Sequence, residues 1–446
     1  NDYFVCFNEA YTGSMLIRFE VFNHRSIKDP VELSLVAVDD GRAEARAAPL
    51  VGVSLLTVAA IYGPNASGKS NLLDALSWLR DAVASSIMVA EYEIPLDPFA
   101  LDGRAVKSTG FELEMLIAGV RFEYVLELEP ESVIYEGLFH YPEKKRRRIF
   151  ERDSEGLKLQ RGLGALSGTR ELLTDRTLAL TAARRFDAPL VRRFAEAVQR
   201  IQPLGQTIRR SRRQYAGHVS FSSRYEGRST RQLLEERSAP TLFDLGNDDV
   251  AMELRPEQAL AMLRMADLGI SDVIFEEDEN RFRKGVMRAE PRMFLLHDTD
   301  TPGYPVPLDF ADESVGTKTW FNLVGPVLHA LADGSVILFD ELDASLHPTL
   351  SAELIRLFHS PVENPFGAQL IFTSHDTSLL NHLNRDEVWL TEKRSDGSTR
   401  LGSLAEFAGE RVRKSQNLES AYLQGRFGAL PQVDQYEFLR AFGLVG

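Results

Sequence analysis

Hydrophobic and polar residues alternate along this chain with two different periods, and each period predicts a different kind of element. A period of two predicts two or three strands within 15–38 and further strands within 95–128, where residues 118–119 would form a hairpin turn. On the first strand, this period places three apolar side chains on one face: Ile17, Phe19 and Val21. We therefore expect the first part of the chain to be a β-rich lobe with one buried helix.

Further along the chain, helical periods alternate with short apolar runs. Apolar residues spaced three and four apart predict helices at 69–83, 164–202, 256–268, 318–331, 348–358 and 432–442. Short apolar runs predict buried strands at 55–61, 335–339, 369–373 and 388–390, and a hairpin within 292–310. Helices placed between buried strands are typical of a parallel sheet that is covered on both faces, so we expect an α/β core.

The same pattern divides the chain into an extension and three larger parts. Residues 1–14 differ from the rest of the chain, because Met15 opens a stretch that reads like a natural start, and we expect them to be an extension. The predicted parts are an N-terminal lobe at 15–143, a mainly helical, arginine-rich insertion at 144–268, and a C-terminal lobe at 269–446. Within the insertion, polar residues at 211–247 predict a loop or a mobile lid.

The strongest chemical signal lies at 61–79, which reads IYGPNASGKSNLLDALSWL and fits the pattern of a phosphate loop. Its glycines let successive backbone N–H groups point at a phosphate, and the helix after the loop adds the positive end of its dipole. Lys69 would bring its charge to the β- and γ-phosphates, and the Ser70 hydroxyl would ligate Mg²⁺. The alternative is a glycine turn that binds nothing. The predicted nucleotide-binding residues of this loop are Gly63, Pro64, Asn65, Ala66, Ser67, Gly68, Lys69, Ser70 and Asn71.

Two carboxylates come after the buried strand at 335–339, in the sequence VILFDE. The carboxyl ends of the strands are where open α/β sheets bind ligands. Asp340 can hold Mg²⁺ there, and Glu341 can polarise a water molecule for attack on a γ-phosphate. The alternative is a pair of residues that merely caps the strand.

Two further motifs also place polar residues at the end of a predicted strand or helix, but each alone is a weaker indication of a nucleotide site. His375 lies in the sequence TSHD after the strand at 369–373, where it can hydrogen-bond the γ-phosphate and the attacking water, or can be purely structural. The sequence ESVGTK at 313–318 precedes a predicted helix. Ser314 and the N–H groups near Gly316 would present a positive helix end to an anion, although a plain N-cap explains the same residues.

Composition limits the classes of protein that this chain can belong to. Its 446 residues are 44% hydrophobic and 26% charged, which is ordinary for a soluble globular protein of cytoplasmic type, and no run of residues is apolar enough to predict a membrane span. Cys6 is the single cysteine, which rules out an intrachain disulfide and a cysteine metal cluster. The net charge of −14 argues against a protein that binds nucleic acid over its whole surface.

Arginine clusters leave a local nucleic-acid contact open. They lie at 144–148, 184–185, 192–193, 209–210 and 212–213. Basic clusters bind phosphate backbones without reading sequence, but solvated helix faces and ion pairs within an acidic protein would explain them equally well.

In their order along the chain, the phosphate loop, ESVGT, DELDASLHP and TSHD resemble the ABC-type ATPase heads of the RecF/SMC/OLD branch. The chain more closely resembles the prokaryotic AAA-type ATP-binding proteins associated with phage defence and abortive infection, and FNHRSI near the start and YLQGRFGALP near the end are similar to that group. The resemblance covers most of 15–431. It implies an α/β P-loop NTPase fold: an ABC-ATPase head with a mixed sheet core, an antiparallel β lobe and a helical insertion.

The resemblance also implies roles for individual residues. Residues 63–70 would be Walker A, Asp340 Walker B, Glu341 the catalytic base, 343–347 the D-loop with Asp343, and His375 the switch histidine. Residues 314–317 would be the signature that closes over ATP bound by a second subunit, so a homodimer or a higher homo-oligomer with ATP and Mg²⁺ is implied. Asn23 and Arg25 would reach the nucleotide from the first lobe.

The chain departs from the pattern of the ABC-type ATPases at several positions, and these departures argue against some members of that class. Its signature lacks the glycine–glutamine form of transporters, and no glutamine lies between Ser70 and Leu159 to serve as a Q-loop. The insertion is too short for the coiled coil of SMC proteins, and the chain after His375 has no room for the nuclease domain of OLD proteins.

We therefore expect a Mg²⁺-dependent ATPase whose dimerisation and hydrolysis regulate a separately encoded effector, a nuclease or a toxin, in anti-phage defence. The alternatives are a DNA-binding repair ATPase similar to RecF and SMC proteins, and an ATP-binding scaffold with little turnover.

Overall fold

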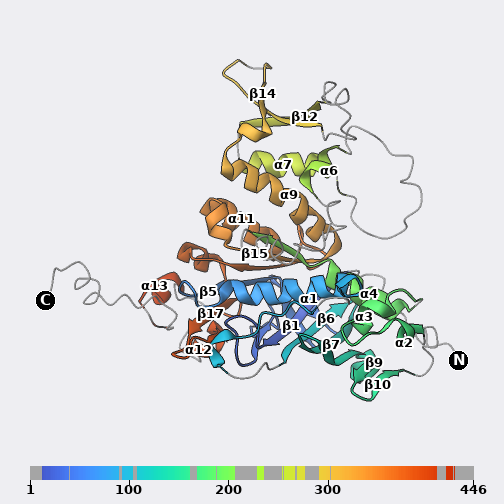
Figure 1. Ribbon diagram of the computed structural model, residues 1–446. Coiled ribbons are helices and arrows are strands. Elements are labelled where there is room, and N and C mark those ends of the chain that lie inside the picture. Colours follow the sequence, from blue (N-terminus) through green and yellow to red (C-terminus); the bar gives the residue numbers. More distant parts are fainter. Residues whose placement is uncertain are drawn as a thin grey trace.

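The structure is a computed structural model, and it describes residues 13–39, 41–89, 93–103, 108–160, 168–186, 188–205, 229–235, 254, 256–266, 269–276, 291–301, 303–408, 418–424 and 426. Two sheets and a helix between them form the body of the molecule, and a smaller helical lobe rises from it (Figure 1). The predicted extension falls almost wholly outside the described residues, as do most of the 211–247 segment and the 432–442 helix.

The first sheet is antiparallel and has seven strands in the order β10-β9-β8-β7-β6-β1-β2. The predicted alternation is confirmed only in part. Phe19 and Val21 pack in the main core. The strand shifts register between Leu16 and Arg18, and Ile17 packs in a separate cluster with Met15 and Leu55. The predicted hairpin turn is also confirmed, with positive φ angles of 48° at Ala118 and 77° at Gly119. The strands are β1 Ser14–Phe22, β2 Val31–Ser34, β6 Thr109–Ile117, β7 Val120–Glu129, β8 Ser132–His140, β9 Arg147–Asp153 and β10 Gly156–Leu159.

The second sheet has six strands in the order β11-β15-β16-β5-β17-β18 and is parallel except for the edge strand β18. Its parallel strands are short and apolar, as the sequence predicts, because helices or the other sheet cover both faces. The strands are β5 Val58–Tyr62, β11 Gln202–Gly205, β15 Val336–Asp340, β16 Gln369–Thr373, β17 Val388–Lys393 and β18 Thr399–Ser403.

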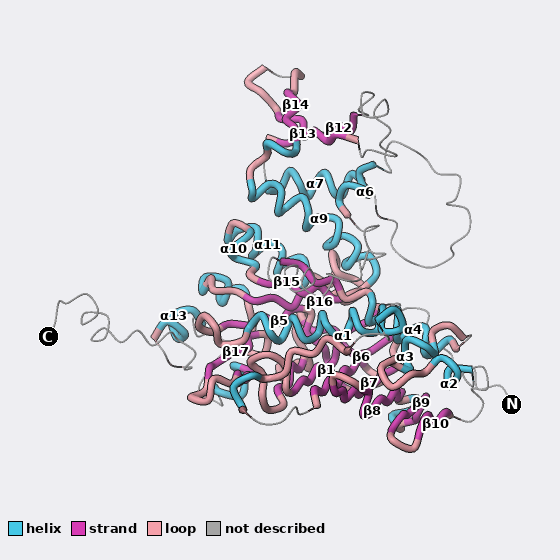
Figure 2. Tube along the Cα trace, in the orientation of Figure 1, coloured by secondary structure: helices cyan, strands magenta, loops and turns pink. Residues whose placement is uncertain are grey.

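Helix α1, Lys69–Val89, lies between the two sheets, and Figure 2 shows it crossing the body of the molecule. Its predicted apolar face, which comprises Leu72, Leu73, Leu76, Leu79 and Val83, is at most 3% exposed. These side chains share one core with Phe19 and Phe122 of the first sheet and with Leu338 and Ile371 of the second. The helix that opens with the phosphate loop is therefore held by both sheets.

A buried glutamine joins the two sheets directly. Gln369 of β16 is fully buried, and its Oε1 accepts from the backbone N of Leu16 at 2.5 Å. Its Nε2 donates to the carbonyl oxygens of Leu16 at 3.0 Å and Leu56 at 2.8 Å. The side chain thus pairs with backbone groups as a neighbouring strand would, and it fixes the β lobe onto the parallel sheet.

The helical lobe rests on the other face of the second sheet. Helix α9 spans Val315–Asp333 and packs with α6, Thr230–Glu235, and α7, Pro256–Ala266. Above these helices in Figure 1 lies a three-stranded antiparallel sheet with the order β12-β13-β14. Its strands are β12 Ile270–Glu276, β13 Arg292–His297 and β14 Val306–Asp309.

The remaining elements are short connectors and covers. The helices are α2 Thr169–Leu172, α3 Ala179–Ala183, α4 Pro189–Gln199, α10 Leu342–Ser345, α11 Pro348–His359, α12 Leu404–Ala408 and α13 Leu418–Leu423. The strands β3 Ala45–Ala48 and β4 Val53–Leu56 form a hairpin, and the 3-10 turns are η1 Ala100–Asp102, η2 Pro142–Lys144, η6 Phe310–Asp312 and η7 Thr377–His382. Within the described ranges, no helix is both long and apolar enough to span a bilayer.

The structure differs from the predicted division of the chain at one boundary. The expected insertion begins at Lys144, yet β9 and β10 continue the seven-stranded sheet as far as Leu159. Charged residues at 144–148 hide the strand pattern, because Arg146 and Arg148 pair with Glu123 and Glu151 on the polar face of the sheet. Likewise, the predicted helix at 164–202 contains α2, α3 and α4 as separate pieces and ends at strand β11.

Candidate functional site

The phosphate loop runs from the end of β5 to the start of α1. Its turn depends on left-handed backbone at Gly63, with φ 151°, and Gly68, with φ 102°, and also at Ala66, with φ 60°. A side chain at Gly63 would collide with Thr391 of β17, and one at Gly68 would collide with Thr399 of β18. Both glycines are therefore required by close packing as well as by the turn.

Lys69 lies within the curve of the loop. It is 6% exposed, and its Nζ donates to the carbonyl oxygens of Gly63 at 2.9 Å and Pro64 at 3.2 Å. Burial lowers the pKa of Lys69, and the negative charges of Asp340, Asp343 and Glu341 act in the opposite direction. A lysine whose charge faces these carboxylates is well placed to meet a phosphate that brings further negative charge.

Asp340, at the end of β15, links the start of helix α1 to the end of β16. Its Oδ1 accepts from the hydroxyl of Ser70 at 2.8 Å and from that of Thr373 at 2.8 Å. Asp340 is only 1% exposed, and its other oxygen, Oδ2, is buried and has no hydrogen-bond partner among the residues that the structure describes. A buried carboxylate oxygen left without a partner is costly, so a cation that approaches Oδ2 would complete the site. The oxygens of Asp340 and Ser70 are of the kind that Mg²⁺ prefers, and the donor set therefore fits that ion.

Glu341 adopts a conformation that is rare for its residue type. Its φ and ψ are both 59°, in the left-handed region, and its backbone N donates to the hydroxyl of Thr373 at 2.7 Å. Left-handed backbone costs a residue with a side chain about 1–2 kcal/mol. Here the hydrogen bond to Thr373 helps hold the conformation that turns the chain out of β15 beside Asp340.

His375, which follows strand β16, and Asp343 of helix α10 meet at the same edge of the sheet. The backbone N of His375 donates to Asp343 Oδ1 at 3.0 Å. The pKa of His375 is lowered, first by burial and then by the positive charge of Lys69, while nearby carboxylates act in the opposite direction. A histidine near Lys69 that stays neutral at pH 7 can both accept and donate a hydrogen bond at a phosphate. The predicted residues Lys69, Ser70, Asp340, Glu341, Asp343 and His375 are thus brought together.

Ser314 and Gly316 lie apart from this group. Ser314 is the N-cap of α9, and its Oγ accepts from the backbone N of Thr317 at 3.0 Å. Ser314, Val315 and Gly316 are all exposed, with Val315 at 79%. The described contacts of Ser314 include none with the phosphate loop of the same chain, and a role in nucleotide binding remains a prediction.

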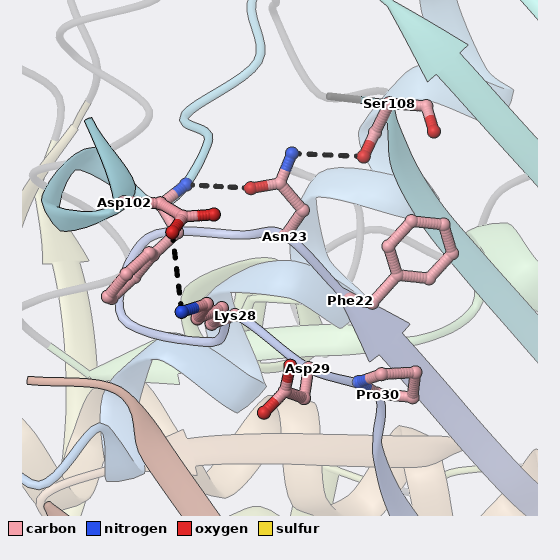
Figure 3. Close-up of a pocket in the computed structure, with 8 residues that line it drawn as sticks. Phe22, Asn23, Lys28, Asp29, Pro30, Asp102 and Ser108 are labelled. Atoms are coloured by element: carbon pink, nitrogen blue, oxygen red, sulfur yellow. Dashed lines mark hydrogen bonds and ion pairs between the residues drawn. The ribbon is translucent and has the colours of Figure 1, made fainter. Parts of the chain in front are cut away.

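Asn23 and Arg25 lie in a turn after β1, each with a positive φ of 52°. The Asn23 amide donates to the Ser108 carbonyl at 2.9 Å and accepts from the Phe99 backbone at 3.0 Å, at the wall of a cavity of about 400 Å³ (Figure 3). The Arg25 Nε lies 3.1 Å from Asp74 of α1 and 3.3 Å from Asp97. These contacts support the turn, and a nucleotide contact by Asn23 or Arg25 remains a prediction.

Sequence reasoning missed a set of hydroxyl groups that support the loop from behind. The Ser67 hydroxyl lies 2.5 Å from that of Thr391, and Thr399 donates to the Ser67 carbonyl at 2.8 Å. Ser26 lies 2.7 Å from the hydroxyl of Thr399 and accepts from the Asn71 amide at 2.6 Å. Ser26 belongs to the FNHRSI motif, so that motif was a usable signal. Nothing in the local sequence singles out the two threonines.

Strand β11 pairs in parallel with β15, and its last residue, Gly205, is in register with Asp340. Strand β11 therefore ends at the edge of the sheet where Asp340 lies.

A phosphate loop, a buried aspartate next to a glutamate, and a histidine at the end of the adjacent strand define an ABC-type P-loop ATPase. The sequence matches the family described as "AAA domain, putative AbiEii toxin, Type IV TA system" over residues 58–179 and 184–381, and the chain belongs to this family. The match confirms the resemblance predicted from the motifs. The two sheets and the helical lobe confirm the predicted fold class, an α/β head with a mixed sheet core and an antiparallel β lobe.

No curated protein matches the sequence. Among solved structures, the SMC head domain from Thermotoga maritima is similar at 14% identity and a TM-score of 0.37, over 87% of this chain and 98% of that one. An Smc head bound to the C-winged helix domain of ScpA is similar at 12% identity and a TM-score of 0.42, over 87% of this chain and 97% of that one. An Smc head domain from Pyrococcus furiosus, with an extended coiled coil and the C-terminal domain of ScpA, is similar at 13% identity and a TM-score of 0.40, over 88% and 97%.

Proposed function

We propose that this protein is a Mg²⁺-dependent ATPase in which two copies close over ATP and hydrolyse it. The observation that carries this proposal is the arrangement at Asp340. Its Oδ1 is fixed by Ser70 and Thr373, and its Oδ2 is buried and finds no hydrogen-bond partner within the described part of the chain. A strand-capping carboxylate would have both oxygens satisfied or solvated, whereas a cation site needs one left for the ion.

Each residue of the site has a task that its position explains. The phosphate loop binds the triphosphate through its N–H groups, and the Nζ of Lys69 moves from the Gly63 and Pro64 carbonyls to the phosphate oxygens. Ser70 and Asp340 would hold Mg²⁺, which neutralises charge on the β- and γ-phosphates when bound. Glu341 accepts a proton from the attacking water, and His375 hydrogen-bonds the γ-phosphate.

The exposed start of α9 supports a dimer. Ser314, Val315 and Gly316 present free helix N–H groups to solvent, and the dipole of a 19-residue helix adds positive charge there. We propose that this end binds the γ-phosphate held by the other copy. Asn23 and Arg25 belong to the proposed nucleotide contacts, because Ser26 of the same turn hydrogen-bonds Asn71 beside the loop.

The biological role that we propose is regulation of a separately encoded effector in anti-phage defence. The description of the family, which names a putative toxin of a toxin–antitoxin system, supports a role of this class. The effector would be a nuclease or a toxin, and the protein would act in the cytoplasm. Co-purification with the products of neighbouring genes tests this part of the proposal.

The proposed chemistry is tested by Glu341→Gln. This change removes the base but keeps the size of the side chain and leaves Ser70, Asp340 and Lys69 in place. We expect turnover to fall at least a hundredfold, and an ATP-dependent dimer to become stable enough to isolate by size-exclusion chromatography with light scattering. Glu353→Gln, on α11, where the side chain is 40% exposed, is the matched control and should leave both properties unchanged. Equal turnover by the wild type and Glu341→Gln would remove Glu341 from the mechanism, and no turnover by the wild type would favour the scaffold alternative.

The DNA-binding alternative depends on the arginine clusters. Several of these arginines already contact groups of the protein itself, which argues against a role for them in binding DNA. Arg146, Arg147 and Arg148 each contact a glutamate, and Arg184 donates to the Val83 carbonyl at 3.1 Å. The clusters at 209–210 and 212–213 lie outside the described residues. A gel shift on duplex and single-stranded DNA across a salt series tests this alternative, and absence of binding at low salt would exclude it.

A further inference from the structure

The segment that leads into helix α9 is tied to strand β13 at both ends of that strand. Arg292, the first residue of β13, forms an ion pair with Asp309. His297, the last residue, places its Nε2 2.7 Å from Glu313 Oε1. Because β13 is the central strand of its sheet, with β12 on one side and β14 on the other, both anchoring points belong to a strand that is paired along its length.

Glu313 is buried although its neighbours in the chain are not. Its side chain is 4% exposed, while Ser314, Val315 and Gly316 are all exposed. Burying a carboxylate is expensive unless it is paired, and His297 supplies the pairing here. The contact thus fixes the residue directly before the Ser314 cap, and it limits how the exposed helix end can be oriented.

We propose that Glu313 and His297 are positioning residues for hydrolysis: together they hold Ser314 and Gly316 in the orientation that meets the γ-phosphate of the other copy. This inference rests on the proposed function, since it requires that the α9 end act across a dimer. Neither residue lies within the group formed by Lys69, Asp340 and His375, so neither is expected to affect the first binding of nucleotide by a single copy. Glu313 and His297 are instead expected to affect the closure of the dimer and the rate of turnover.

Glu313→Ala tests the inference with little risk to the fold. The side chain of His297 is 25% exposed, so water can replace the lost carboxylate. We expect the affinity of the separate copy for a fluorescent ATP analogue, and KM for ATP, to stay within twofold of wild type. We expect kcat to fall at least tenfold, and ATP-driven dimerisation, measured by sedimentation, to need at least tenfold more protein. Glu313→Gln keeps an acceptor for His297 and should recover most of both losses.

A histidine remote from α9 provides the matched control. His359 at the end of α11 lies 3.2 Å from Glu387 Oε1, and their side chains are 13% and 0% exposed. His359→Gln removes another histidine that lies next to a buried glutamate and should leave kcat and dimerisation unchanged, whereas His297→Leu should reproduce the effect of Glu313→Ala.

Several outcomes would overturn the inference. It is wrong if Glu313→Ala hydrolyses ATP and dimerises within twofold of wild type. It is also wrong if Glu313→Ala loses nucleotide affinity or melts many degrees lower and Glu313→Gln does not recover these properties, since that would mean a purely structural role. If the unmodified protein neither hydrolyses ATP nor dimerises in its presence, the proposed function is wrong, and this inference is then wrong as well.

Discussion

At the scale of single residues, the motifs indicated most of the site, and the structure adds the groups that hold it together. Glycines, a lysine and acidic residues in short motifs can be found in a sequence because their spacing is fixed by a local turn. Thr391 and Thr399 could not be found in this way, and Thr373, although it lies in the TSHD motif, was given no role. Their hydroxyl groups reach the loop or Asp340 only because strands far apart in the chain are placed side by side.

Thr373 is the residue whose removal should be most informative. Its hydroxyl donates to Asp340 Oδ1 at 2.8 Å and accepts from the Glu341 backbone at 2.7 Å, so one group fixes both acidic residues. We expect Thr373→Val, which keeps the shape but removes the hydroxyl, to lower kcat about tenfold, the equivalent of about 1.4 kcal/mol. Steady-state kinetics measure this effect. Thr373→Ser retains the hydroxyl and is the control, and equal loss in both variants would point to packing instead.

At the scale of elements, local periodicity predicted the strands and helices of the core well. The structure has strands at β5, β15, β16 and β17, helices at α1, α9 and α11, and the hairpin between β6 and β7, where the pattern placed them. Strands β8, β9, β10 and β11 are among those that were missed. In β9, charged side chains on the polar face obscured the alternation, and β11 has only four residues, among them a proline and a glycine.

The connection between the two sheets depends on one element contact that can be tested. Gln369→Ala would leave the backbone N and O of Leu16 and the O of Leu56 without this buried partner. Each unsatisfied buried group costs about 1–3 kcal/mol, so we expect the free energy of unfolding to fall by about 3 kcal/mol or more. Urea unfolding monitored by circular dichroism measures the change. Gln424→Ala, in an exposed position after α13, is the control and should change stability by less than about 0.5 kcal/mol.

At the scale of the whole molecule, the sequence predicted the fold class because the motifs occur in a fixed order, but it could not give the arrangement of the sheets. That arrangement depends on helix α1 packing its apolar side chains against both sheets. Only the structure shows that α1 shares one core with each sheet. The predicted division of the chain into lobes was therefore less accurate than the prediction of single helices and strands. The boundary at 143–144 separates strands of one sheet.

Since α1 is held by both sheets, nucleotide bound at its start should stabilise both lobes together. At Mg²⁺-ATP concentrations of a hundred times Kd, we expect the free energy of unfolding to rise by about 2.7 kcal/mol in a single transition. Lys69→Ala should abolish nucleotide binding and therefore this increase, while Lys158→Ala, a lysine remote from the loop, should retain it. Differential scanning fluorimetry with and without Mg²⁺-ATP measures the effect. An equal shift in Lys69→Ala would mean that ATP binds elsewhere.

The glutamine that joins the two sheets has a consequence for how the protein is made. Leu16 and Gln369 are 353 residues apart, and Ser67 is 324 residues from Thr391. At synthesis rates of about 5–20 residues per second, the first strand and the phosphate loop leave the ribosome on the order of half a minute before their partners exist. The first strand and the phosphate loop thus lack these contacts until translation has passed β17, and a chain that ends before β16 would leave Leu16 and Leu56 without the Gln369 side chain.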